Sequence, residues 1–283
     1  MSTLTCSFCN EKISLSARNC PNCQSDVGFP NVRATQIPGE IGALQKRVDD
    51  AEVSSGLRKC KDVINRFEHC VSISKAVFCR SLDMVHELVT RENILYISFQ
   101  KQVNSGLRLP NDDIWEIARP AVEATLFPHY SDQINFMCLT ANNKGLTNYG
   151  SYSIVLKDHM ICNRASVFEE NSVIFMDKHK VVAGKPVPPG YRASWSSRGK
   201  LAVAKLHSRI DPATSEDHFP EILMRSGADN SLDDFIEVHI YGPISPKAFE
   251  RIVGPKPVRG ADLVLWKSVE TKCRRHGIIL EEC

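Results

Sequence analysis

Two Cys-x-x-Cys pairs lie within the first 25 residues, and this spacing constrains the fold more than any other feature of the chain. Cys6 and Cys9 form one pair, Cys20 and Cys23 form the other, and ten residues separate the pairs. Each pair is expected to form a tight knuckle with both sulfurs pointing at one metal, and four thiolates make the closed tetrahedral site of a structural zinc ion. A segment this short has no core of its own, so the metal supplies most of its folding free energy. The sequence therefore predicts a zinc ribbon over residues 1–27.

The role of this ribbon is open from the pattern alone. A redox motif is the alternative to zinc, but it normally has one pair at a strand-to-helix turn. A closed four-sulfur site leaves no coordination position for catalysis, which favours recognition or docking. The ribbon could contact nucleic acid, protein or the rest of this chain. Its balanced charge, with Glu11 and Asp26 against Lys12 and Arg18, favours protein contact.

Composition limits the class of protein. The 283 residues are 42% hydrophobic, enough for a real core, and 35 basic against 33 acidic residues argue against a bulk electrostatic binder of nucleic acid. We expect no membrane span, because no apolar run is long enough, and no signal peptide, because the N-terminus has no basic start. Eleven cysteines without a disulfide-like spacing point to a reducing compartment, so a cytoplasmic location is expected.

Hydrophobic periodicity predicts an α+β fold behind the ribbon. Residues 28–39 contain proline and glycine and are predicted to be a linker. Residues 40–130 are predicted to be mainly helical, with an early strand near 73–80, and residues 131–283 to form an α+β region. Within the latter we expect strands at 134–139, 152–156, 172–176, 235–241 and 278–280, and helices over 194–209 and 262–275.

The segment 233–243 is the strongest candidate for chemistry. Strict alternation places Phe235, Glu237, His239 and Tyr241 on one strand face and three aliphatic residues on the other. The aliphatic face is expected to pack on a core, while the other face presents a carboxylate, an imidazole and a phenol together, as a strand lining a cleft does. The other interpretation of the same pattern is a solvated edge strand.

This segment resembles the last catalytic strand of ADP-ribosyltransferases. In the poly-ADP-ribose polymerases a catalytic glutamate begins a strand, a tyrosine follows four residues later, and a turn leads to another strand. Glu237, Tyr241 and the run 249–253 have that spacing. The segment also looks like the end of uncharacterised bacterial proteins thought to share the fold. The run 148–157 is similar to a strand in those proteins and in some phage-resistance proteins, so the resemblance covers roughly 73–258.

The resemblance implies a mixed or antiparallel sheet of the ADP-ribosyltransferase type and NAD as the substrate. NAD is cleaved at the nicotinamide–ribose bond through an oxocarbenium-like transition state, and the glutamate stabilises the developing positive charge. The implied catalytic residues are Glu237, Arg80 and Tyr149. The implied NAD-binding residues are Arg80, Ser81, Tyr96, Tyr152 and His239.

The chain departs from the polymerase pattern at one point. It has no His-Gly-Ser or His-Gly-Thr triplet, so an arginine-type arrangement is assumed, with Arg80 at the end of the early strand holding the dinucleotide. From the residues alone, Arg80 could equally be a surface arginine at a strand end. A tyrosine on a strand is usually a packing residue with its hydroxyl at the surface.

The function implied is that of an NAD-dependent ADP-ribosyltransferase, either a toxin or an antiviral, anti-phage effector. Its acceptor would be a macromolecule: RNA such as mRNA, DNA, or protein. A toxin of a toxin–antitoxin pair would also have an antitoxin protein as its partner. Two alternatives stay open, a non-catalytic zinc-ribbon adaptor and an NAD glycohydrolase that uses the same cleft.

Overall fold

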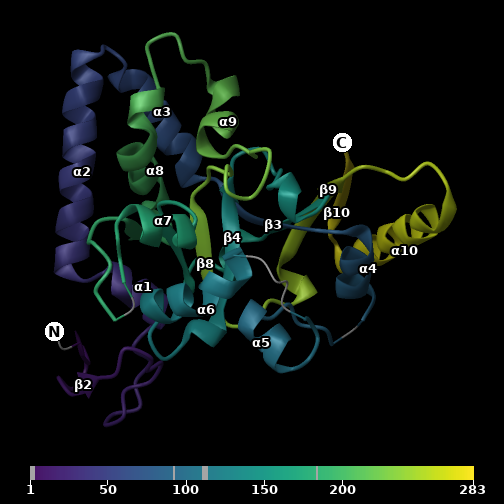
Figure 1. The fold of residues 1–283 in the computed structure, drawn as a ribbon, viewed down its shortest axis with the longest axis horizontal. Helices are drawn as coiled ribbons and strands as arrows, with labels where there is room; N and C mark the ends of the chain where they lie inside the picture. Colours follow the sequence, from purple (N-terminus) through teal and green to yellow (C-terminus); the bar gives the residue numbers. More distant parts are fainter. Residues whose placement is uncertain (1–3, 92, 110–113, 183) are drawn as a thin grey trace.

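The computed structural model describes residues 4–91, 93–109, 114–182 and 184–283, and Figure 1 shows their arrangement. A small hairpin of β1 (Leu4–Thr5) and β2 (Lys12–Ile13) lies near the N-terminus. The other strands of the described chain form one sheet, and helices pack against it. The fold is therefore α+β, as the periodicity predicts.

The elements after the hairpin have the following bounds. The strands are β3 (Lys75–Arg80), β4 (Ile134–Thr140), β5 (Tyr152–Leu156), β6 (Ala165–Phe168), β7 (Arg192–Ser194), β8 (Glu237–Tyr241), β9 (Phe249–Gly254) and β10 (Ile279–Glu282). The helices are α1 (Pro30–Thr35), α2 (Pro38–Leu57), α3 (Lys61–Ser72), α4 (Leu82–Thr90), α5 (Phe99–Asn104), α6 (Ile114–Leu126), α7 (Ser172–Lys178), α8 (Arg198–Leu206), α9 (Phe219–Leu223) and α10 (Gly260–His276). Among the described residues, no helix combines the length and the apolar character that spanning a bilayer requires.

The sheet has eight strands in the order β10-β9-β5-β3-β4-β8-β6-β7. It is mixed, because β10 runs parallel to β9 while the other neighbours are antiparallel. The early strand β3 lies between β5 and β4. One sheet therefore contains strands from both regions that the sequence analysis distinguishes, residues 40–130 and residues 131–283.

The largest core covers one face of this sheet. Helices α2, α3 and α8 lie toward the β8 side in Figure 1, and α4 packs with α10 on the β9–β10 side. Helix α3 buries Val63, Ile64, Phe67 and Val71, the three- and four-residue spacing of one helix face. Leu57, the last residue of α2, is 81% exposed, because the chain turns there before α3 begins.

Strand β8 alternates as the sequence predicts. Ile236, Val238 and Ile240 face the large core, while Glu237 and His239 face the opposite side, where smaller apolar clusters cover the sheet. The strand lies between β4 and β6 and is buried on both faces, so the interpretation as a solvated edge strand is wrong.

Two segments differ from the secondary structure expected. The run 172–176 was predicted as a strand but begins α7, because the Asn171 side chain caps the helix by accepting hydrogen bonds from the N–H groups of Val173 and Ile174. An apolar run this short fits either period. The run 28–39, predicted as a linker, contains α1 and the start of α2.

The 194–209 helix is shorter than expected. Strand β7 ends at Ser194, and only Arg198–Leu206 is α-helical, with a 3₁₀ turn on each side. The predicted strands at 73–80, 134–139, 152–156, 235–241 and 278–280 correspond to β3, β4, β5, β8 and β10, and the helix predicted at 262–275 corresponds to α10.

One glycine fixes how the loop before β5 meets the end of β3. Gly150 has φ +139° and ψ 160°, a region that residues with a side chain rarely enter. A Cβ placed there would lie 2.4 Å from the carbonyl carbon of Arg80. Only glycine therefore lets the 3₁₀ helix η2 (Thr147–Tyr149) lie against the end of β3.

We expect Gly150→Ala to lower the free energy of unfolding by about 1–3 kcal/mol, because the residue must leave a strained region and push against backbone. Gly42→Ala, inside α2 with nothing within 4 Å of the added Cβ, is the matched control and should raise it by about 0.5–1 kcal/mol. Urea unfolding of both variants measures the difference. Equal stability of the Gly150 variant and the wild type would show that this contact does not constrain the loop.

Candidate functional site

A cavity of about 390 Å³ opens where two neighbouring strands separate. Strands β3 and β4 pair only through Lys75–Val77 and Cys138–Thr140. Beyond Val77 and Cys138, β3 continues beside β5 alone and β4 beside β8 alone. The residues that follow on both strands, 78–80 and 135–137, line the cavity in this fork.

Glu237 lies in this cavity, at the first position of β8 and directly across from Cys138. The residue is 6% exposed, and its Oε2 accepts two hydrogen bonds, from Ser172 Oγ at 2.7 Å and from His239 Nε2 at 2.8 Å. Within the described chain, no hydrogen-bond donor holds the other oxygen, Oε1. The carboxylate is thus fixed through one oxygen, and the second is available to a ligand.

His239 supports this carboxylate and does not line the cavity. Its ring is buried among three phenylalanines, with centroid distances of 4.8 Å to Phe127, 4.9 Å to Phe136 and 5.8 Å to Phe168. Because Nε2 donates to Glu237, the ring orients the carboxylate. The sequence analysis assigned His239 to NAD binding, whereas in the structure it lies outside the cavity lining and contacts Glu237.

Arg80 ends β3 and lines the same cavity. Its Nη2 donates to the Tyr96 hydroxyl, its Nη1 donates to the carbonyl of Cys79, and its guanidinium lies 5.0 Å from the centroid of the Tyr96 ring. The Tyr96 ring in turn stacks on Phe78 at 4.6 Å. Tyr96 is buried, and its hydroxyl and ring both contact the Arg80 guanidinium, which limits the positions that Arg80 can take.

Arg80 differs from the two other arginines of the cavity in its charge balance. Arg108 pairs with Glu116, and Arg119 pairs with Glu123. In the described ranges no carboxylate forms an ion pair with Arg80. Among the described arginines of this cavity, Arg80 is thus the one whose charge no carboxylate of the described chain compensates, and a guanidinium of this kind can bind an anion.

Tyr149 lies at the mouth of the cavity, at the end of η2. Its residue is 41% exposed, but burial of the hydroxyl end, together with the nearby Cys138, Asp233 and Glu237 groups, raises the pKa of the phenol well above its usual range. The hydroxyl therefore stays protonated and can donate a hydrogen bond at neutral pH.

Two residues expected near NAD lie elsewhere. Ser81 is exposed at the start of α4, outside the residues that line the cavity. Tyr152 faces the large core, where its hydroxyl donates to the carbonyl of Pro255 at 2.8 Å and its ring lies near Trp266. Arg80 and Tyr152 are cross-strand partners, but only Arg80 reaches the cavity, because it is the last residue of its strand.

Sequence reasoning missed several residues of the cavity. Ser172 was assigned to a strand, and Arg119 lies on α6, where no motif marks it. The Arg119 guanidinium lies 4.7 Å from the Phe99 centroid and 4.9 Å from the Phe136 centroid, which helps to wall the cavity. Cys79 and Cys138 also line it, and burial raises the pKa of both thiols, so neither is a thiolate nucleophile at neutral pH.

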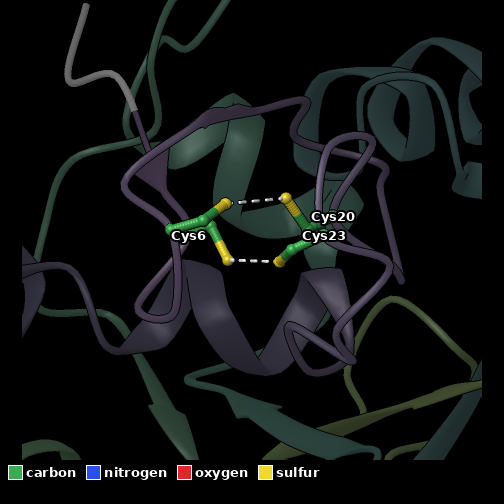
Figure 2. A group of neighbouring side chains, drawn as sticks. Cys6, Cys20 and Cys23 are labelled. Atoms are coloured by element: carbon green, nitrogen blue, oxygen red, sulfur yellow. Dashed lines mark hydrogen bonds between the residues drawn. The ribbon is translucent and has the colours of Figure 1, made fainter.

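The four N-terminal cysteines form a second candidate site. Their sulfurs lie within 4.8 Å of one another, and Figure 2 shows sulfurs facing each other from the two knuckles. The Sγ–Sγ distance is 3.6 Å for Cys6–Cys23 and 3.5 Å for Cys9–Cys20. A tetrahedral zinc site with Zn–S bonds of about 2.3 Å would separate its sulfurs by about 3.8 Å. The arrangement can therefore hold a metal ion such as zinc.

Both knuckles have the same local structure. The residue after each second cysteine has positive φ, Asn10 at 61° and Gln24 at 59°, and its N–H bonds back to the carbonyl of Cys6 or Cys20. This turn brings the two sulfurs of a pair to one side. Hydrogen bonds from the Ser25 hydroxyl and backbone N–H lower the pKa of the Cys23 thiol to about 6, which favours the thiolate that binds metal.

No protein-family model matches the sequence, and no curated protein matches it either. What this protein does must therefore be argued from the two sites themselves.

We expect the purified full chain to hold about one zinc ion, and Cys20→Ser to lose it, because one missing thiolate breaks the closed coordination shell. Cys162→Ser is the matched control, since Cys162 is exposed and outside the cluster. Elemental analysis of dialysed protein gives the stoichiometry. Full zinc retention by Cys20→Ser would contradict the four-cysteine site.

A second pair of variants tests how Glu237 is held. His239→Ala removes a buried donor and leaves space among three phenylalanines, so it should cost about 1–3 kcal/mol of unfolding free energy. His239→Gln keeps an N–H donor at a similar distance and should retain most of that stability. Denaturant titration at pH 7 measures both, and equal losses would mean that the hydrogen bond to Glu237 contributes nothing.

Proposed function

We propose that this protein is an NAD-dependent ADP-ribosyltransferase. One observation carries the proposal: a single cavity is lined by both Arg80, which has no carboxylate partner among the described residues, and the buried carboxylate of Glu237, which is held there through Oε2 alone. The volume, about 390 Å³, falls within the range of small-molecule sites. The resemblance around Glu237 in the sequence points to the same two residues.

Arg80 binds the diphosphate of NAD in this proposal. A guanidinium presents paired N–H donors that match phosphate oxygens, and the stacked Tyr96 and Phe78 rings limit its motion. Since the other arginines of the cavity already face Glu116 and Glu123, their charge is largely compensated. Arg80 is therefore the residue that sets the position of the anion.

Glu237 acts on the ribose next to nicotinamide. Its Oε1 accepts a hydrogen bond from a ribose hydroxyl, and its charge stabilises the positive charge that develops at C1′. Ser172 and His239 hold Oε2, so little reorganisation is needed when the bond breaks. Tyr149, at the mouth, offers its exposed ring to nicotinamide and its neutral hydroxyl as a donor.

The reaction balances without another cofactor. The C1′–N bond breaks, nicotinamide leaves as a neutral molecule with the electron pair, and a nucleophile of the acceptor forms the new bond to C1′. The proton of that nucleophile passes to solvent. We propose a macromolecular acceptor, RNA such as mRNA, DNA or protein, with water as the acceptor of the NAD glycohydrolase alternative.

The cellular part of the proposal follows from the chemistry and from the resemblance. An enzyme that modifies macromolecules with NAD suits a toxin or an anti-phage effector, and a toxin needs an antitoxin protein. Reduced thiolates at the four-cysteine site, loaded with structural zinc, suit the cytoplasm.

The adaptor alternative is less consistent with the site. Burying a carboxylate is costly unless it is compensated, and an adaptor gains nothing from keeping one oxygen free in a cavity. Cavities that bring a few charged and polar side chains together are typical of binding and active sites. This argument favours catalysis over docking at the fork between β3 and β4.

The test is incubation of the full chain with labelled NAD and cell extract, with nuclease and protease treatment of separate portions. We expect transfer of label to a polymer, and at least a 100-fold lower rate for Glu237→Gln, because an electrostatic contribution of this size is typical of a transition-state carboxylate or oxyanion donor. Glu270→Gln, on α10 and outside the residues that line the cavity, is the control and should keep full activity.

The outcomes separate the three candidates. Label on a polymer supports transfer, release of ADP-ribose without label on a polymer supports the glycohydrolase, and intact NAD in every extract rules out both. Expression in growing cells adds a second comparison: growth arrest by the wild type that Glu237→Gln abolishes supports the enzyme, and equal harmlessness favours the adaptor.

A further inference from the structure

Arg33 binds several carbonyls of the four-cysteine module, which is the segment of residues 4–27. Arg33 on α1 donates five hydrogen bonds to backbone carbonyls: Nη1 to Ala17 at 2.6 Å, Val27 at 3.3 Å and Gly28 at 2.9 Å, and Nη2 to Ser14 at 3.3 Å and Leu15 at 3.2 Å. All five carbonyls lie in the module or directly after it. A guanidinium can bind them together only while the module keeps the fold that presents them.

The same short helix is attached to the strand that carries Glu237. Asn31 is 2% exposed, and its Nδ2 lies 3.1 Å from each of three acceptors: the carbonyl of His239 on β8, Ser166 Oγ on β6 and the carbonyl of Arg164. Asn31 and Arg33 are two residues apart, so α1 connects the module to the β6–β8 pair over one helical turn.

A ring contact reinforces the connection. The Phe29 ring, just before α1, lies 5.4 Å from the ring of Tyr241 at the end of β8. The Arg18 guanidinium of the module also lies over Phe29, 3.7 Å from the ring centroid. Residues from the module, α1 and β8 therefore form one continuous set of contacts.

His239 takes part in two of the relevant hydrogen bonds. Its carbonyl accepts from Asn31, and its ring donates to the carboxylate of Glu237. His239 thus contacts both the α1 segment and the carboxylate of Glu237.

We propose that the metal-loaded four-cysteine module acts as an intramolecular clamp on β8, and that Asn31 and Arg33 are positioning residues which act on Glu237 through His239. The partner of the ribbon, open from the sequence, is then this chain's own sheet. The clamp rests on the metal role in the proposed function and does not depend on the NAD chemistry.

The experiment is amide hydrogen exchange on the full chain, with one equivalent of zinc or after removal of zinc with a chelator. We expect metal removal to speed exchange in residues 4–28 and also, by at least tenfold, in β8, while β9, far from the module in the sheet order, changes little. Exchange that accelerates only in residues 4–28, or nowhere, overturns the clamp.

Variants with intact zinc isolate the connecting residues. Arg33→Ala and Asn31→Ala should speed exchange in β8 in the zinc-loaded protein, with the zinc content unchanged. Gln36→Ala, exposed directly after α1, is the matched control and should leave β8 as in the wild type. Unchanged exchange in β8 for both variants overturns the assignment of Asn31 and Arg33. Because the measurement needs no NAD, an inactive protein with the expected exchange would contradict the enzyme and leave the clamp standing.

Discussion

Backbone pairing between β3 and β4 ends after three residues on each strand, and the candidate site depends on that ending. Up to Val77 and Cys138 the two strands satisfy each other's hydrogen bonds. Beyond them β3 keeps only its other neighbour, β5, and β4 keeps only β8. Backbone groups that face the gap then need partners other than the neighbouring strand, as where the Arg80 guanidinium donates to the carbonyl of Cys79. The gap that results is lined by strand residues, which are held more rigidly than loop residues.

Glu237 and Arg80, one acidic and one basic side chain, both line the cavity in that gap, and different contacts hold each of them in place. Glu237 is buried, and two donors from β8 and α7 hold one of its oxygens. Arg80 is held by stacked aromatic rings instead of a carboxylate. A carboxylate and a guanidinium that pair with each other would neutralise the cavity. Here each is anchored separately, by different neighbours.

The alternation of β8 was predictable because a strand has a fixed period of two, and the side of each residue follows once the strand is identified. Glu237, Arg80, Tyr96 and Tyr149 line one cavity, whereas Ser81 and Tyr152 lie away from it. The failure for Tyr152 is instructive. Tyr152 is the cross-strand partner of Arg80, but its ring packs in the core beside Trp266. The local sequence does not show which of the two paired residues packs in the core and which one lines the cavity.

The sequence by itself determined the four-cysteine site and the α+β class, because ligand spacing and hydrophobic period are local properties of the chain. The tertiary structure alone decided what these parts do to one another. It placed an early strand at the centre of the sheet, brought Ser172 and Arg119 to the cavity, and joined the module to β8 through Asn31 and Arg33. These contacts link residues up to 208 positions apart, and such pairings depend on how helices and strands pack and not on any neighbour in sequence.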